Sequence, residues 1–128
     1  MSTEFIKDVM TSAPHTVGAE QSLEVAQSLM LQYGIRHLPV LHAGKCVGIL
    51  SDRDVRAALA AEGKSASEML VRDFCTEDVY GISPTTPTKE VAAFMGDRGV
   101  GSAVIVDGEK VVGIFTATDA CKLLARVL

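Results

Sequence analysis

The chain has 128 residues, and its 12 Lys and Arg against 16 Asp and Glu give a formal net charge of -4 at pH 7. This acidic balance disfavours nucleic acid as a partner, because nucleic-acid binding depends on neutralising phosphates. No apolar run reaches the roughly 18 residues that predict a membrane span. The first residues lack the basic and apolar regions of a signal peptide, and Cys46, Cys75 and Cys121 lack disulfide or zinc-site spacing, so we expect reduced thiols in a cytoplasmic protein.

The first half of the chain predicts a helix, a hairpin and a second helix. Apolar residues at helical spacing over 22–33 indicate the first helix, which a glycine follows. Two apolar runs, 37–41 and 46–51, flank a turn and predict paired strands. The second helix is expected over 54–62, and residues 63–69 form the only plausible linker, too short for the two halves to move independently.

The second half predicts the same order of elements. Thr86 is the expected helix N-cap, with Pro87 at the first helical position. The apolar runs 103–106 and 111–115 flank an Asp-Gly pair that favours a hairpin turn. A last helix is expected over 119–128.

An internal repeat explains this similarity. A shift of 65 residues needs no gap and superimposes identical residues, among them Asp8 on Asp73, Gly34 on Gly99, and 47–49 on 112–114. We therefore predict an α/β (α+β) fold made of two tandem β-α-β-β-α units, repeat 1 at 1–63 and repeat 2 at 64–128. One such unit buries little core alone, so we expect the two to pack about a pseudo-twofold axis with two related clefts between them.

The segments 8–11, 37–40, 47–54 and 112–119 resemble the CBS-domain pattern, and the resemblance covers essentially the whole chain. It implies a tandem CBS pair, often called a Bateman module, that binds AMP, ADP, ATP, S-adenosylmethionine, NADH or a related adenosyl compound in the clefts between the repeats. It also implies a homodimer, no required cofactor, and regulation of a partner protein, which we expect to be a separate chain.

Ser51 with Asp54, and Thr116 with Asp119, are the candidate ribose-binding residues. A carboxylate at the end of a strand can accept hydrogen bonds from both ribose hydroxyls, and the Ser or Thr hydroxyl can bind a further ligand oxygen. In the family that these residues resemble, the Asp binds ribose. The same spacing also fits a helix capping box, and one residue can serve both roles.

Arg36, His37 and, more weakly, Arg53 are the candidate phosphate-binding residues. Arg offers a planar fork that suits phosphate, and His adds a pH-dependent donor. The equivalent positions of Arg36 and His37 in repeat 2, Gly101 and Ser102, carry no charge, so we expect unequal clefts. We expect Arg36 and His37 to serve the same cleft as Asp54. The alternative is a solvated strand edge.

The region before the first helix of each repeat resembles the family's adenine-binding wall. The candidate adenine-binding residues there are His15, Val17, Tyr80 and Ile82, and Pro39 in the following strand is a further candidate. His15 and Tyr80 have rings that could stack on a base, and an apolar slot with backbone donors could read its edge. Val17 and Ile82 are equally expected as core residues.

Catalysis and metal binding are disfavoured by the absence of the usual motifs. The sequence has no G-x-S-x-G, H-E-x-x-H or phosphate-binding loop, and its histidines at 15, 37 and 42 have no metal-site spacing. The main alternative to a ligand sensor is a ligand-free dimerisation or protein-interaction module. An enzyme is the third possibility.

Overall fold

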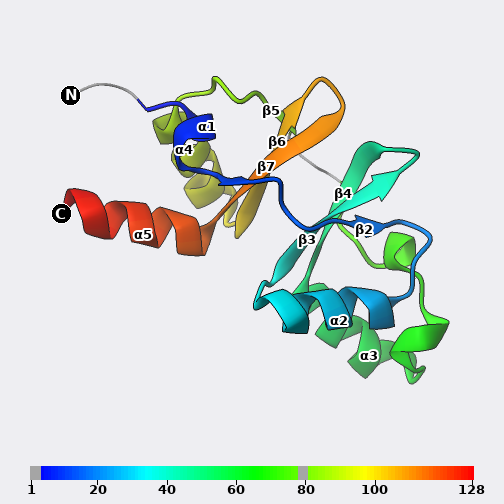
Figure 1. The fold of residues 1–128 in the computed structure, drawn as a ribbon. Helices are drawn as coiled ribbons and strands as arrows, with labels where there is room; N and C mark the ends of the chain where they lie inside the picture. The colour runs from blue at the N-terminus through cyan, green and yellow to red at the C-terminus, as the bar shows by residue number, and fades with distance from the viewer. Residues whose placement is uncertain (1–3, 78–80) are drawn as a thin grey trace. The chain divides into compact units, whose positions relative to one another are not determined.

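The computed structural model describes residues 4–77 and 81–128 (Figure 1). The described part of His15–Val79 forms one compact unit, and the described parts of Met1–Pro14 and Tyr80–Leu128 together form the other. Among the described residues, every helix is too short or too polar to cross a membrane.

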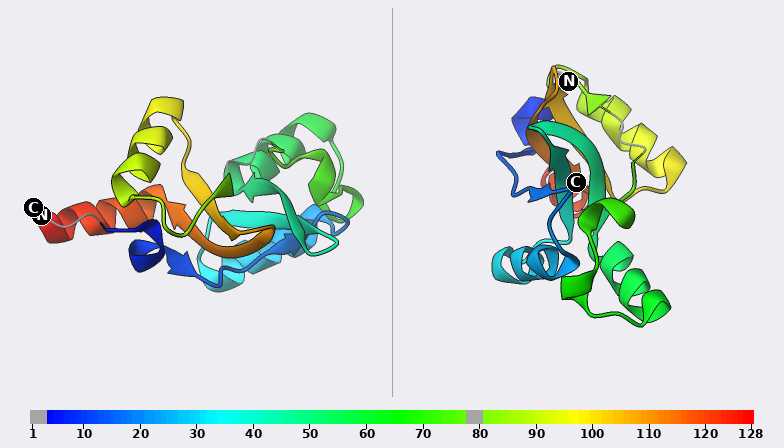
Figure 2. Two further views of the ribbon diagram at one scale, coloured as in Figure 1. Left: turned by 90° about the horizontal axis from the view of Figure 1, so that it is seen from above. Right: turned by 90° about the vertical axis from the view of Figure 1, so that its right-hand side faces the viewer.

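The unit that holds the first hairpin has a three-stranded sheet with the order β2-β3-β4. β2 (Val17–Gly18) runs parallel to β3 (His37–His42), which pairs antiparallel with β4 (Lys45–Ser51). Helices α2 (Leu23–Tyr33) and α3 (Asp52–Glu62) lie on one face of this sheet (Figures 1 and 2). The core therefore forms between sheet and helices, and it includes the residues Leu23, Ala26, Leu38, Val40, Leu50 and Val55.

The other unit repeats the design with a four-stranded sheet of order β1-β7-β6-β5. β5 (Gly81–Ile82) runs parallel to β6 (Ser102–Asp107), which pairs antiparallel with β7 (Lys110–Thr116). α1 (Ile6–Val9), α4 (Thr88–Arg98) and α5 (Ala117–Val127) complete the unit. Its buried core includes Ile6, Ile82, Val91, Met95, Ile105 and Phe115.

The segment that leads into each repeat packs in the unit of the other repeat's hairpin. β1 (Thr11–Ser12), from the start of the chain, pairs with β7 through Thr11↔Ile114. In the other unit, Thr76 bridges Ile49 of β4 with two backbone hydrogen bonds of 2.9 Å. The compact units therefore do not follow the division into 1–63 and 64–128, which describes the repeat in the sequence.

The predicted linker is a part of one core. Residues 66–68 form a short 3₁₀ helix, η1 (Ala66–Glu68), against α2, and a second one, η2 (Val71–Asp73), follows. Met69 is 3% exposed, and its carbonyl accepts a hydrogen bond from the Leu23 N–H at 2.9 Å. Because this segment supplies core side chains, it does more than connect the two repeats.

The structure confirms the α/β class and the predicted order of helices and hairpins, with three helix starts corrected. α3 begins at Asp52 and α5 at Ala117, each two residues earlier than predicted, because Ser51 and Thr116 are the N-caps.

α4 begins at Thr88 with Pro87 as its N-cap, one residue later than the sequence predicts. The reason is that the backbone of Thr86 belongs to the preceding turn. Its N–H donates to the Ser83 carbonyl at 3.0 Å, and its carbonyl accepts from the Ile6 N–H at 2.8 Å.

Candidate functional site

Ser51 and Asp54 form a reciprocal pair where β4 meets α3. The Ser51 hydroxyl accepts a hydrogen bond from the Asp54 N–H at 3.0 Å, and Asp54 Oδ2 accepts one from the Ser51 N–H at 2.9 Å. This is a capping box, as one of the two interpretations of the Ser51 and Asp54 spacing predicts. It occupies only one carboxylate oxygen, and among the described residues Asp54 Oδ1 has no hydrogen-bond partner.

Thr116 and Asp119 form the equivalent capping box where β7 meets α5. The two bonds measure 3.1 Å from the Asp119 N–H to the Thr116 hydroxyl and 3.0 Å from the Thr116 N–H to Asp119 Oδ2. Here the carboxylate has an additional neighbour. The Thr11 hydroxyl of β1 lies 3.3 Å from Oδ1 and 3.4 Å from Oδ2 of Asp119.

His37 lies beside the first carboxylate. It is opposite Ser51 in the register of β3 and β4, and it is half-buried. Burial is the main cause that lowers the pKa of His37 from its usual 6.5, while the Asp54 carboxylate opposes the shift and the Arg36 charge adds to it. The geometry therefore places two candidate binding residues near each other at one strand end. His37 is the candidate for binding a phosphate, and Asp54 is the candidate for binding ribose hydroxyls.

Arg36 borders a groove on the helical side of the same unit. An open groove of about 690 Å³ runs along α2 beside the start of α3, and Arg36, Asp52 and Arg56 line part of it. Arg56 and Asp52 form an ion pair of 2.7 Å, one turn apart in α3. Arg53 is exposed in the first turn of α3. Arg36 thus borders this groove and also lies close enough to His37 to influence its pKa.

Two of the candidate adenine-binding residues are core residues. Val17 is 2% exposed and Ile82 is 1% exposed, and each belongs to the core of its own unit. Pro39 is buried in β3, opposite Ile49. The side chains of Val17 and Ile82 pack inside the protein, so only their backbone groups can take part in recognising a base.

The ring of His15 is exposed and has an aromatic partner. It stacks on Tyr33 at the end of α2, with the ring centroids 3.6 Å apart and the planes inclined by 12°. Tyr80, the candidate for the equivalent role in repeat 2, lies outside the described residues.

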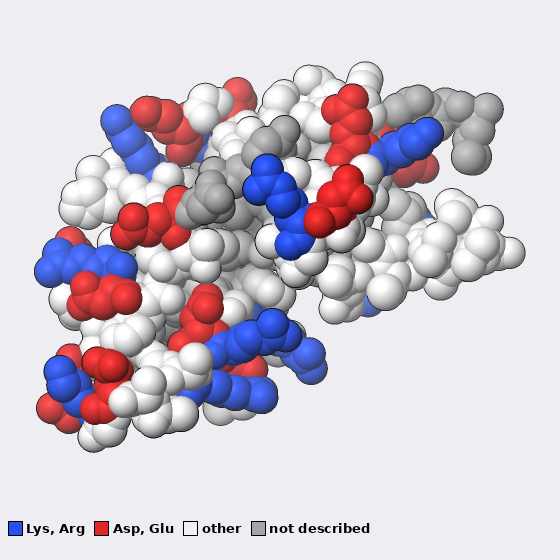
Figure 3. All heavy atoms as spheres, turned by 180° about the vertical axis from the view of Figure 1, so that it is seen from behind, with Lys and Arg blue, Asp and Glu red and all other residues white. Residues whose placement is uncertain are grey.

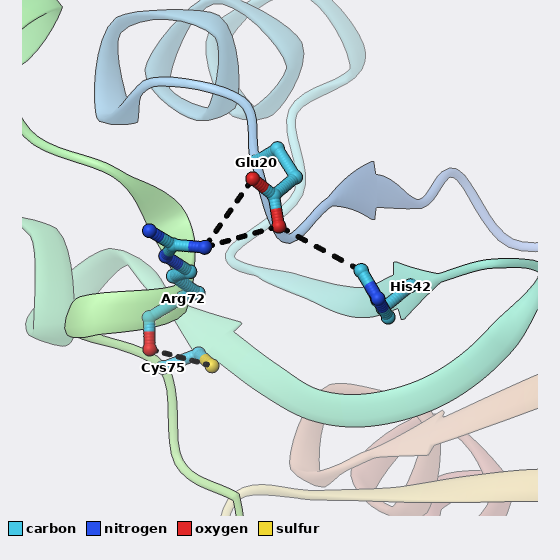
Figure 4. A network of polar contacts seen from close by, with 4 residues as sticks. All are labelled: Glu20, His42, Arg72 and Cys75. Carbon is cyan, nitrogen blue, oxygen red and sulfur yellow. Dashed lines mark hydrogen bonds and ion pairs between the residues drawn. The ribbon is translucent and has the colours of Figure 1, made fainter.

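His42 belongs to a surface network with Glu20 and Arg72 (Figure 4). Arg72 Nη1 lies 3.2 Å from Glu20 Oε1, and His42 Nδ1 lies 3.7 Å from the same oxygen. The Cys75 thiol contacts the Arg72 carbonyl oxygen at 3.8 Å. All three charged or ionisable side chains are more than half exposed, so this network stabilises the fold only slightly.

The described residues contain no group of three or more His, Cys, Asp and Glu side chains placed to hold a metal ion. Lys and Arg are interspersed with Asp and Glu on the face drawn in Figure 3.

Thr11 is the site residue that the sequence-based reasoning missed. The available signal was its identity with Thr76 at the 65-residue shift. Its distance of 108 residues from Asp119 conceals the contact, which depends on β1 pairing with β7.

Comparison with known proteins identifies the family. The model of the CBS domain matches residues 6–61 and again residues 71–126, so the chain belongs to the CBS domain family as a tandem pair. It is 31% identical over 114 residues to the CBS domain-containing protein YhcV of Bacillus subtilis, spanning 89% of this chain and 81% of that protein. It is also 31% identical to the L-aspartate semialdehyde sulfurtransferase of Methanocaldococcus jannaschii, but it spans only 23% of that protein's length.

The fold matches a solved complex. The CBS domain pair of protein MJ0100, solved with 5′-methylthioadenosine and S-adenosyl-L-methionine, superimposes with a TM-score of 0.90. The sequence identity is 27%, and the match covers 99% of this chain and all of that chain. The chain is thus similar in fold to the MJ0100 domain pair and similar in sequence to a part of a larger enzyme.

Proposed function

We propose that the chain is a regulatory module that binds an adenosyl compound, with Asp54 or Asp119 accepting the ribose hydroxyls. The observation that carries the proposal is the carboxylate at each strand end. Its capping box fixes its position and, at Asp54, leaves Oδ1 available. A carboxylate held this way is preorganised for charge-assisted hydrogen bonds to a diol. The adenosyl ligands of the MJ0100 domain pair support this ligand class.

The ligand is an adenine nucleotide, S-adenosylmethionine or an NADH-type dinucleotide, and phosphate preference depends on His37 and Arg36. His37 lies close enough to both the Asp54 carboxylate and Arg36 for each to influence its pKa, and Gly101 and Ser102 carry no equivalent charge. A phosphorylated ligand is therefore better suited to the Asp54 site. His15, with its exposed ring stacked on Tyr33, offers a surface on which a base can stack.

Ligand binding is proposed to regulate a partner protein and not to lead to a reaction. For that, the ligand must bind one conformation more tightly than another, since a ligand shifts an equilibrium only by its differential affinity. We propose that this regulation takes place in the cytoplasm and that the chain acts as a homodimer.

A ligand-free interaction module is the second candidate, and α5 favours it. None of its residues is buried, its Leu124 and Val127 are 54% and 63% exposed, and the following Leu128 is 94% exposed. Apolar side chains on one helix can form a self-complementary contact between two copies. In this case dimerisation itself, without a small molecule, is the function.

Thermal unfolding with a ligand panel tests the proposal. AMP, ADP, ATP, S-adenosylmethionine and NADH are added at millimolar concentration, and a ligand at about 100 times its dissociation constant adds roughly 2.7 kcal/mol of stability. We expect at least one compound to raise the melting temperature of the wild type, and the double variant Asp54→Ala/Asp119→Ala to lose the ligand-induced rise.

A matched control separates loss of ligand from loss of a helix cap. Ser22 caps α2 by accepting a hydrogen bond from the Val25 N–H at 3.3 Å, and it is outside the proposed site. Ser22→Ala should lower the baseline melting temperature and keep the full ligand-induced rise. A flat response of the wild type to the whole panel would refute ligand sensing and leave the interaction module.

A further inference from the structure

The two carboxylates proposed to bind ribose are not equally accessible to a ligand. Both use Oδ2 to accept the N–H of their capping partner. The Asp119 carboxylate is also approached by the Thr11 hydroxyl, at 3.3 Å from one oxygen and 3.4 Å from the other. Thr76, the residue that the repeat aligns with Thr11, makes no hydrogen bond to Asp54 in the described part of the chain.

This difference affects the same oxygens that a ribose would use. A diol needs acceptors on the carboxylate, and at Asp119 a protein hydroxyl already lies within hydrogen-bonding distance of both oxygens. Bonds of 3.3 Å and 3.4 Å are longer than the usual 2.7–2.8 Å for hydroxyl donors, so a ligand can displace Thr11 at a modest cost. At Asp54 no displacement is required, because Oδ1 has no partner among the described residues.

We infer that Thr11 sets the affinity of the second site by competing with the ligand ribose for Asp119. The inference rests on the proposed function. The Asp54 site fills first, and the Asp119 site fills only at higher ligand concentration. The two sites of one chain would then fill at two different ligand concentrations. The residue that separates these concentrations, Thr11, comes from β1 at the start of repeat 1.

Titration calorimetry with adenosine tests this inference, because adenosine lacks the phosphates that His37 and Arg36 would distinguish. The variant Asp54→Ala isolates the Asp119 site, and Thr11→Val is added to it to remove the hydroxyl while keeping a branched side chain in β1. We expect Thr11→Val to tighten the isolated site by about threefold to tenfold, the size of one net hydrogen bond.

Thr76→Val is the matched control, since it makes the same change at the repeat-related position, whose side chain makes no bond to the Asp54 carboxylate within the described part of the chain. In the Asp119→Ala background, which isolates the Asp54 site, it should leave adenosine affinity within about twofold. Circular dichroism melts confirm that each variant is folded.

The results separate the two proposals. If the wild type binds neither adenosine nor any nucleotide, the proposed function fails. If the wild type binds but Thr11→Val leaves the isolated Asp119 site unchanged or weaker, Thr11 does not compete and this inference is overturned while ligand sensing stands. An equal gain from Thr76→Val would also overturn it.

Discussion

The backbone oxygen of Thr76 lies where it would contact any side chain at position 48: a Cβ added to Gly48 would be 2.8 Å from it. The close approach exists because Thr76 and Ile49 exchange two backbone hydrogen bonds, which draw the incoming segment against β4. A Cβ added to the repeat-related Gly113 would approach its neighbour even more closely, but that neighbour is the side chain of Met10.

Gly48→Ala should therefore destabilise the protein by about 2 kcal/mol, because a hydrogen-bonded backbone has to move. Gly113→Ala should cost less, since the flexible Met10 side chain can change rotamer. Gly96→Ala is the control: it lies in α4 with nothing within 4 Å, and it should add up to about 1 kcal/mol. Urea unfolding measures all three, and a Gly48→Ala variant as stable as wild type would contradict the packing.

Removing the capping hydroxyls should lower stability in the absence of any ligand. Ser51→Ala leaves the Asp54 N–H without its acceptor at 3.0 Å, and Thr116→Ala does the same to the Asp119 N–H. Each substitution should cost about 1 kcal/mol in the free energy of unfolding. Thr116→Ser keeps the hydroxyl and should cost less than Thr116→Ala. Equal losses for these two would mean that the cap contributes nothing.

His37 should make stability depend on pH. Burial lowers its pKa in the folded protein below the usual 6.5, so between these two values the unfolded chain binds more protons than the folded one. Stability is then fully present above about pH 6.5, falls as the pH falls toward the folded pKa, and levels off below it. His37→Ser, which copies Ser102 of the other repeat, should reduce this loss.

The comparison is made by urea unfolding of wild type and His37→Ser at several pH values between about 5 and 8. The difference between the two curves cancels the groups that do not interact with His37, so it reports on this residue and its coupling to neighbouring charges. Parallel curves would show that the residue is as solvated in the folded state as in the unfolded state.

Cys121 should be the most reactive of the three thiols. It is exposed in α5, whereas Cys46 and Cys75 are half-buried and burial raises the pKa of each. A raised pKa lowers the fraction of nucleophilic thiolate, so alkylation of Cys121 near neutral pH should be faster by roughly tenfold or more. Mass spectrometry after a short iodoacetamide pulse identifies the modified residue. In Cys121→Ser the rapid reaction should disappear, and its persistence would show that one of the other thiols is accessible.

Much of the local structure could be predicted from the sequence, because it depends on contacts between near neighbours in the chain. The helix ending at Gly34 and the hairpins follow from apolar spacing and turn residues. Each capping box also lies within four residues of the chain, so the Ser51 and Asp54 motif could be identified from the sequence. Its two interpretations, a helix cap and a ribose-binding pair, are compatible. The resemblance to the CBS pattern implied the adenosyl ligand class, which the repeat alone did not.

Tertiary structure alone decided which segments complete each unit and what surrounds each carboxylate. The leading segments containing Thr11 and Thr76 align with each other in the repeat, and strand pairing uses backbone groups that every residue shares. No local pattern therefore distinguishes pairing within a repeat from the exchange that the structure shows. That exchange places the Thr11 hydroxyl against Asp119 and, among the described residues, no corresponding hydroxyl against Asp54. The sequence does not reveal this contact, because Thr11 and Asp119 are 108 positions apart in the chain.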